Sequence, residues 1–218
     1  TKMTYAELYR EVAKVARALK AAGVKAGDRV AGFMPNMPQT VVAMLAATSM
    51  GAIWSSCSPD FGIKGVMDRF SQIQPKVLFA ANGYWFKGKN LGSLDRIAEI
   101  VQQLDTIEKV VITPYTQQDF DISGIPRAVK YDEFKAKEDN LEVEFTQLPF
   151  DHPLYIMFTS GTTGLPKCMV QSAGGILVHH MKELILHTNL SREDTIFYFT
   201  TCGWMMWNWL VSSLDRKS

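Results

Sequence analysis

The protein is a chain of 218 residues, 47% of them hydrophobic, with 23 basic and 22 acidic side chains and a formal net charge of +1. This composition is typical of a globular protein with one substantial core or two small ones, and it excludes a strongly basic nucleic-acid-binding protein. With no run of about 18 apolar residues, no membrane span is expected, and three scattered cysteines without metal-ligand spacing indicate a reducing, cytoplasmic setting and no metal site.

The first 113 residues predict alternating helices and strands. Thr4 and Glu7 form a capping box for an amphipathic helix that stops at Gly23. Strands are then expected at residues 29–34, 52–55, 77–80 and 110–113, and helices at residues 39–50, 64–74 and 94–104. Because helical crossovers join successive strands, the expected fold class is α/β, with a mostly parallel sheet flanked by helices.

The next segment, residues 114–150, is polar and predicts a connector between two sheet layers, with one weak strand at 128–131. The expected sublayers are therefore 1–113 and 151–218. After the connector we expect a strand up to residue 158, a strand at 167–171, a helix capped by Ser172 that runs through His187, and a strand at 194–200.

Residues 155–170 are the most informative stretch, Y-I-M-F-T-S-G-T-T-G-L-P-K-C-M-V. Glycines allow positive φ and close approach of backbone N–H groups to an anion, while hydroxyl groups and a lysine supply donors and charge. We therefore predict a phosphate-binding loop rather than an ordinary Gly/Thr-rich hairpin. Its residues are Thr159, Ser160, Gly161, Thr162, Thr163, Gly164 and Lys167. A Walker A loop is disfavoured because Pro166 precedes the lysine and strand-like residues follow it.

The eight residues S-G-T-T-G-L-P-K, from Ser160 to Lys167, resemble the signature loop of the adenylate-forming superfamily, which includes acyl-CoA synthetases, luciferases and peptide-synthetase adenylation domains. The resemblance implies that the loop holds the β- and γ-phosphates of ATP while a carboxylate attacks the α-phosphorus, with Lys167 in the catalytic role. Most members have glycine after the lysine, and this chain has Cys168.

A second unusual stretch, G-W-M-M-W-N-W, begins at Gly203. Core packing and a membrane-surface helix are two interpretations of it, and an apolar acyl pocket is the third. The pocket gains support because ligands gather at the carboxyl ends of strands in α/β sheets, where Thr159 and Thr201 are both expected. The pocket residues are then Gly203, Trp204, Met205 and Met206.

From Thr4 to Leu214 the chain resembles the acetoacetate-activating acyl-CoA ligases. Three stretches carry the resemblance: I-W-S-S-C-S-P-D-F-G at 53–62, D-R-F-S-Q-I-Q-P-K at 68–76 and G-W-M-M-W-N-W from Gly203. The resemblance implies acetoacetate, ATP and coenzyme A as substrates, with Asn208 replacing a histidine found in acetate-activating enzymes. It also implies that this is part of an N-terminal adenylation domain, whose Mg²⁺ ligands and C-terminal domain lie outside these residues. The fragment alone is expected to be inactive. The alternatives are another short-chain acyl-CoA ligase, or a non-catalytic truncated product that binds nucleotide or a partner.

Other polar residues are assigned no chemistry. His179 and His180 are consecutive in a predicted helix, where side chains point about 100° apart, so we expect surface or supporting positions rather than a shared ligand. Asp68 and Arg69 lie on a predicted helix with Lys64, where a solvated face with local ion pairs is expected.

Overall fold

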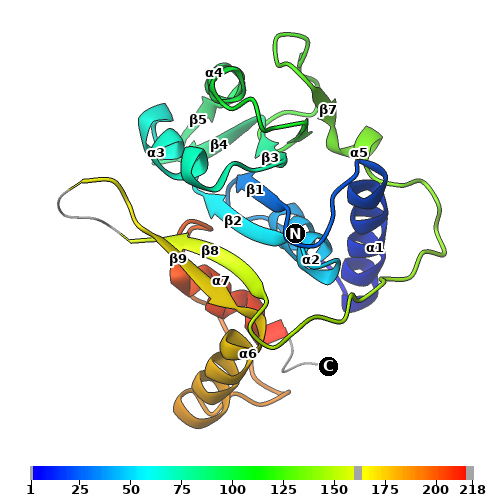
Figure 1. Cartoon of the computed structure of the whole chain (residues 1–218), viewed down its shortest axis with the longest axis vertical. Helices are drawn as coiled ribbons and strands as arrows, with labels where there is room; N and C mark the ends of the chain where they lie inside the picture. Colours follow the sequence, from blue (N-terminus) through cyan, green and yellow to red (C-terminus); the bar gives the residue numbers. More distant parts are fainter. Residues whose placement is uncertain (1, 160–163, 215–218) are drawn as a thin grey trace.

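The computed structural model describes residues 2–159 and 164–214, and at its centre is a seven-stranded sheet (Figure 1). The strand order is β7-β6-β3-β1-β2-β8-β9, and every neighbouring pair is parallel except β8 with β9. The strands are β1 (Arg29–Phe33), β2 (Ile53–Cys57), β3 (Val77–Ala81), β6 (Lys109–Thr113), β7 (Ala128–Lys130), β8 (Pro153–Phe158) and β9 (Cys168–Ser172). The predicted α/β class with a mostly parallel sheet is confirmed.

Helices cover both faces of this sheet (Figure 1). They are α1 (Tyr5–Ala21), α2 (Pro38–Ser49), α3 (Ile63–Ile73), α4 (Leu94–Gln103), α5 (Tyr131–Phe134), α6 (Ala173–Lys182) and α7 (Met205–Ser212). The core of α1, α2 and α7 contains Val30 of β1, whereas the core of α3 and α4 contains its neighbour Ala31. Because both faces of the central strands are buried, these strands appear in the sequence as continuous apolar runs.

Local sequence signals explain how the first helices begin and where they lie. The capping box of α1 is present: the Glu7 N–H donates to Thr4 Oγ1 at 3.2 Å, and the Thr4 N–H donates to Glu7 Oε2 at 2.7 Å. Helix α2 starts with Pro38 and is apolar nearly all round. Six of its residues are buried, and five of these belong to the core that α2 shares with α1 and the sheet.

The segments before and after residues 114–150 share one sheet, whereas the connector was expected to join two layers. Strand β8 pairs in parallel with β2, where Trp54 lies opposite Tyr155. The Ser55 hydroxyl also donates to the Ile156 carbonyl at 2.8 Å. The connector itself supplies β7, which extends the opposite edge of the sheet beside β6. That these residues form the N-terminal part of a larger adenylation domain remains a prediction.

The prediction of a strand at residues 194–200 is wrong. This segment is irregular in the structure, and Phe197 and Phe199 are 81% and 87% exposed. A strand needs a neighbouring ladder for its backbone groups, and no described strand pairs with this segment. Conversely, the antiparallel hairpin of β4 (Gly83–Phe86) and β5 (Lys89–Gly92) was not predicted.

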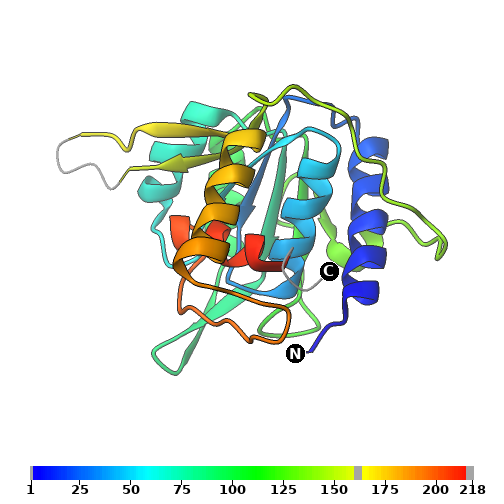
Figure 2. The same cartoon turned by 90° about the horizontal axis from the view of Figure 1, so that it is seen from below.

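After β9, the chain forms α6 and then a short π-helical turn, η1 (Glu183–His187). The helix therefore extends through His187, as predicted, although the Ser172 side chain makes no capping hydrogen bond. In Figure 2 the β8–β9 hairpin projects past the helices. Within residues 2–159 and 164–214, no helix has the length and apolar character needed to cross a membrane.

Candidate functional site

The predicted phosphate loop joins the ends of β8 and β9, so it lies at the edge where the parallel strands have their carboxyl ends. Phe158 pairs with Cys168 at the base of the loop. Just beyond this pair, the Thr159 N–H donates to the Lys167 carbonyl at 3.1 Å, and the Lys167 N–H donates to Thr159 Oγ1 at 3.1 Å. The loop therefore has a fixed neck formed by two of its predicted phosphate-binding residues.

The exposed part of the loop carries its positive charge. Lys167 is exposed, and Gly164 has φ of +103°, a conformation that favours glycine. Ser160, Gly161, Thr162 and Thr163 lie outside the described residues. An exposed ammonium group beside a neck at the carboxyl edge of a parallel sheet is suited to an anionic ligand.

Helix α3 supports the loop from one side. The Arg69 guanidinium carbon lies 4.7 Å from the centre of the Phe61 ring and 5.7 Å from that of Phe158, the last residue of β8. Lys64 and Asp68 form an exposed ion pair at 2.9 Å, which confirms the expected local pairing on this helix.

The second unusual stretch is anchored at the same edge of the sheet through Cys202. Its thiol donates to the Met34 carbonyl at 2.8 Å, just after β1, and the Ser56 hydroxyl of β2 donates to the Cys202 carbonyl at 2.6 Å. Burial raises the pKa of the Cys202 thiol to about 12, so the thiol stays neutral and serves as a hydrogen-bond donor.

Helix α7 continues this anchoring. The indole N–H of Trp207, which is fully buried, donates to Asn36 Oδ1 at 2.9 Å. Asn208 Nδ2 lies 3.4 Å from the sulfur of Met157, two residues before Thr159. The stretch therefore lies across the ends of β1, β2 and β8. The strand that was predicted to precede Thr201 is absent from the described part of the structure.

The four predicted acyl-pocket residues precede or begin α7. Trp204 and Met205 are 59% and 49% exposed, and Met206 is half-buried. Gly203 approaches β2 so closely that a Cβ there would lie 3.3 Å from the Ser58 nitrogen. These residues share the sheet edge with the phosphate loop, but they line neither of the two pockets described next.

An apolar pocket of about 770 Å³ lies between α1, α2, α6 and α7. Tyr155, His180 and Asn208 are buried around it, and the Tyr155 hydroxyl, His180 Nδ1 and Asn208 Oδ1 have no hydrogen-bond partner among the described residues. His180 is only 3% exposed, so the surface position predicted as one alternative is wrong for it, and the supporting position stays a prediction. His180 therefore lines this pocket together with residues of β8 and α7.

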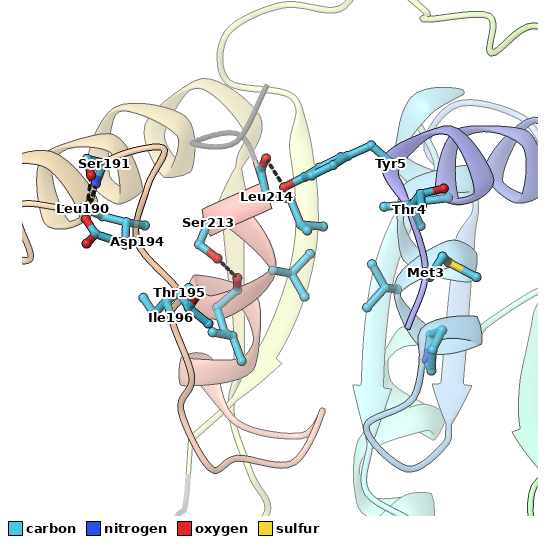
Figure 3. A pocket seen from close by; sticks show the side chains of 15 residues that line it. Met3, Thr4, Tyr5, Leu190, Ser191, Asp194, Thr195, Ile196, Ser213 and Leu214 are labelled. Atoms are coloured by element: carbon cyan, nitrogen blue, oxygen red, sulfur yellow. Dashed lines mark hydrogen bonds between the residues drawn. The ribbon is translucent and has the colours of Figure 1, made fainter. Parts of the chain in front are cut away.

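A smaller pocket of about 410 Å³ lies between the starts of α1 and α2, the end of α7 and residues 190–196 (Figure 3). The Tyr5 hydroxyl donates to the Leu214 carbonyl at 3.1 Å across one side of it. The Asp194 carboxylate accepts hydrogen bonds from the backbone and side chain of Ser191 at 2.7 and 2.8 Å. These contacts join α1 to α7 and fold the irregular segment, and they offer no reacting group to a ligand.

The burial of His180 predicts a pH dependence of stability. Burial lowers the pKa of His180 to about 4, and neighbouring His179 adds to the lowering while Glu183 opposes it. In the unfolded chain the ordinary pKa is about 6.5, so the unfolded state binds more protons between pH 6.5 and 4. We expect the free energy of unfolding to fall by on the order of 1–2 kcal/mol across this window, after allowance for solvent screening.

Urea unfolding at pH 7 and pH 4.5 measures this effect. His180→Gln should reduce the loss of stability between the two pH values, whereas His179→Gln, at the adjacent exposed position, should retain it. The same loss in His180→Gln as in the unsubstituted chain would show that another group is responsible.

The described residues contain no group of three or more His, Cys, Asp or Glu side chains that could hold a metal ion. Cys57 and Cys202 are both buried, and Cys168 is exposed on β9. At the carboxyl edge of the sheet, the described residues thus offer an exposed cation, hydroxyls and apolar side chains. This combination suits a ligand with an anionic group and a small apolar group.

The family model described as AMP-binding enzyme matches residues 1–213. The chain belongs to the AMP-binding enzyme family. Its relatives include the acetoacetyl-CoA synthetase of Mus musculus, 52% identical over 218 residues, which cover 98% of this chain and 32% of that protein. The acetoacetyl-coenzyme A synthetase of Rhizobium meliloti (strain 1021) is 48% identical over 214 residues, or 98% of this chain and 33% of that protein.

The solved structures include a similar protein. The acetoacetyl-CoA synthetase from Streptomyces lividans superposes with a TM-score of 0.93 at 45% identity, over 100% of this chain and 33% of that one. This similarity agrees with the α/β fold described above. The chain spans about one third of the length of the curated relatives that it matches.

Several supporting residues of this AMP-binding segment were not predicted from the sequence. Asn36 holds Trp207, Ser56 holds the backbone at Cys202, and Gln72 contacts the phosphate loop. The stretch 68–76, which contains Gln72, carries part of the family resemblance but predicts no role for that residue. These roles depend on contacts between distant segments, for which the local sequence carries no signal.

Proposed function

We propose that this segment belongs to an ATP-dependent ligase that activates acetoacetate to its acyl-adenylate and then forms acetoacetyl-CoA. The observation that carries the proposal is similarity across 98% of the chain to proteins named acetoacetyl-CoA synthetase. The geometry of the loop supports it, because Lys167 is exposed beside a closed neck at the carboxyl edge of the sheet.

In the proposed first step, an acetoacetate oxygen attacks the α-phosphorus of ATP, and the bond from that phosphorus to the bridging oxygen of pyrophosphate breaks. Lys167 would neutralise the negative charge that develops on the departing pyrophosphate, and the loop hydroxyls and N–H groups would orient it. In the second step, the sulfur of coenzyme A attacks the acyl carbonyl and AMP leaves.

The described residues that would contact ATP are suited to its phosphate groups. Lys167 supplies a full positive charge, and the neck formed with Thr159 holds the start and end of the loop together. Mg²⁺ is proposed to accompany ATP and to reduce the charge of its phosphates. By the family resemblance, its protein ligands are proposed to lie mostly downstream of this segment.

The acyl group is proposed to lie against the start of α7. Met205 and Met206 would contact it, next to Gly203 and Trp204, because this stretch is anchored across the ends of β1 and β2. Methionine side chains are flexible and apolar, so they can fit closely around a short acyl chain.

This placement predicts a change of substrate preference in Met206→Ala. Adding or removing one methylene in an apolar pocket alters discrimination by roughly 1–3 kcal/mol, or about 10- to 200-fold, and Met206→Ala removes more than one such group. We therefore expect the ratio of kcat/KM for acetoacetate to that for acetate to change by at least tenfold. Met181→Ala, on the partly exposed face of α6, is the control and should leave the ratio unchanged. An equal loss of kcat/KM for both acids would instead indicate that Met206 acts in packing.

The function is tested on the polypeptide at its natural full length. ATP–pyrophosphate exchange is measured with acetoacetate, acetate and propionate, and thioester formation is measured with coenzyme A. Acetoacetate should be the best substrate in both assays. A preference for another acid would make the protein a different short-chain ligase, and nucleotide binding without exchange would indicate a non-catalytic product.

A further inference from the structure

One side chain of α3 contacts the phosphate loop on both sides of its lysine. Gln72 Nε2 donates to the Pro166 carbonyl at 2.8 Å, and the Cys168 thiol lies 3.6 Å from Gln72 Oε1. Pro166 and Cys168 are the residues immediately before and after Lys167. The Gln72 amide therefore spans the position of the lysine in the chain.

Both the nitrogen and the oxygen of the Gln72 amide make hydrogen bonds. A glutamine amide has two N–H donors, and Nε2 also donates to the Asp68 carbonyl one helical turn earlier at 2.5 Å. One N–H can thus hold the side chain against its own helix while the other reaches the loop. This geometry fixes the direction of the side chain, although Gln72 is exposed and contributes little to the core.

The helix that carries Gln72 is itself fixed to the sheet. Val66, Phe70 and Ile73 are buried in the core formed with α4. Arg69, one turn before Ile73, also covers the Phe158 ring at the end of β8. A contact from Gln72 thus connects the loop to a rigid part of the fold.

The backbone of Lys167 takes part in the neck of the loop, so its position depends on how the adjacent residues are held. The Lys167 N–H and carbonyl both bond to Thr159. These bonds hold one side of the residue, and the Gln72 contacts to its two neighbours hold the other. In the described part of the chain, Gln72 thus links the residues on both sides of Lys167 to α3.

We propose that Gln72 is a positioning residue that fixes Lys167 in the orientation needed for phosphate binding. The effect of Gln72 on catalysis rests on the proposed function, whereas its contact with the loop is independent of that function. Gln72 acts through Pro166 and Cys168 and does not touch the substrate. The position after the lysine, where the resembling family has mostly glycine, here supplies a thiol that can donate to Gln72.

The test uses two matched substitutions in the natural full-length polypeptide. Gln72→Met keeps the length and the helix propensity of the side chain but removes its hydrogen bonds to the loop. Gln103→Met is the control, because Gln103 is also exposed at the end of a helix and its side chain donates to Glu99, four residues earlier on the same helix. Hydrogen exchange of the peptide 164–170 reports on the loop, and ATP–pyrophosphate exchange reports on catalysis.

Gln72→Met should raise the exchange rate of peptide 164–170 by roughly fivefold, the effect of one net hydrogen bond, with peptides of β1 and β3 unchanged. It should lower kcat of pyrophosphate exchange by a similar roughly fivefold factor, while KM for acetoacetate stays within about twofold. Gln103→Met should change neither quantity. Loop exchange within twofold of the unsubstituted protein would overturn the proposed role of Gln72.

The two readouts separate this inference from the proposed function. If the unsubstituted polypeptide shows no acetoacetate-dependent pyrophosphate exchange, the proposed function fails, and a loop loosened by Gln72→Met still shows the structural contact. If Gln72→Met loosens the loop but Lys167→Ala leaves pyrophosphate exchange intact, the catalytic role of Lys167 fails and the structural contact stands without a catalytic consequence. If Lys167→Ala abolishes pyrophosphate exchange but Gln72→Met behaves like Gln103→Met in both assays, Lys167 keeps its role and the positioning by Gln72 is rejected.

Discussion

Replacing Lys167 with alanine is expected to slow adenylate formation by on the order of a hundredfold or more. The lysine is exposed at the loop neck, where its ammonium group can meet the charge that develops on departing pyrophosphate. A preorganised charge of this kind stabilises the transition state more than the ground state, so the loss should appear in kcat as well as in kcat/KM. Acetoacetate-dependent ATP–pyrophosphate exchange measures it directly.

Two further variants define what the lysine contributes. Lys167→Arg keeps the charge but replaces a compact ammonium with a planar guanidinium, so activity should lie between those of the alanine variant and the unsubstituted enzyme. Lys64→Ala removes another exposed lysine, in the first turn of α3, which follows β2 at the same sheet edge, and should change the rate by less than twofold. A rate for Lys167→Ala within twofold of the unsubstituted enzyme would falsify the assignment of this loop to the chemistry.

Replacing Trp207 with alanine is expected to destabilise the fold by about 3–5 kcal/mol. Its side chain is fully buried in the core formed by α1, α2 and one face of the sheet, and its indole N–H bonds to Asn36 Oδ1 at 2.9 Å. Truncation removes most of this apolar contact, leaves a cavity and deprives the Asn36 amide of its partner. Loss of this size is a large part of the stability of a typical domain.

Trp204→Ala is the matched control because Trp204 belongs to the same stretch but is 59% exposed. It should cost less than about 1 kcal/mol, as most surface substitutions do. Trp207→Phe should lie between the two, since it keeps most of the packing and loses the hydrogen bond. Urea unfolding gives the free energies, and equal effects of Trp204→Ala and Trp207→Ala would show that α7 does not pack as described.

The central strands and the flanking helices were predictable because their signals are local. The run Val77–Ala81 is apolar throughout, and Thr4 and Glu7 specify a helix start without help from the rest of the chain. The segment 194–200 has similar apolar residues but no strand beside it in the described structure. Pairing depends on a partner segment, which residue types alone do not reveal.

The candidate site was predictable to the extent that one contiguous loop carries it. Lys167 and its glycines and hydroxyls stand together in the sequence, so their shared chemistry is visible there. The supporting contacts are not, because Cys202 meets Met34 across 168 residues and Gln72 meets Pro166 across 94. The burial of His180 was not predicted for the same reason, since His180 lines a pocket that is also lined by residues of α1, α2 and α7, far from it in the sequence.

The position of β8 beside β2 has a consequence for the order of folding. Strands β1, β2 and β3 can pair as soon as residue 81 is available, but the Ser55 to Ile156 contact joins residues 101 apart. At a synthesis rate of about 5–20 residues per second, the free edge of β2 would wait roughly 5–20 seconds for its partner strand. The growing chain thus has an open, pairing-competent strand edge on the ribosome during this interval, when a chaperone that shields such edges would have its greatest effect.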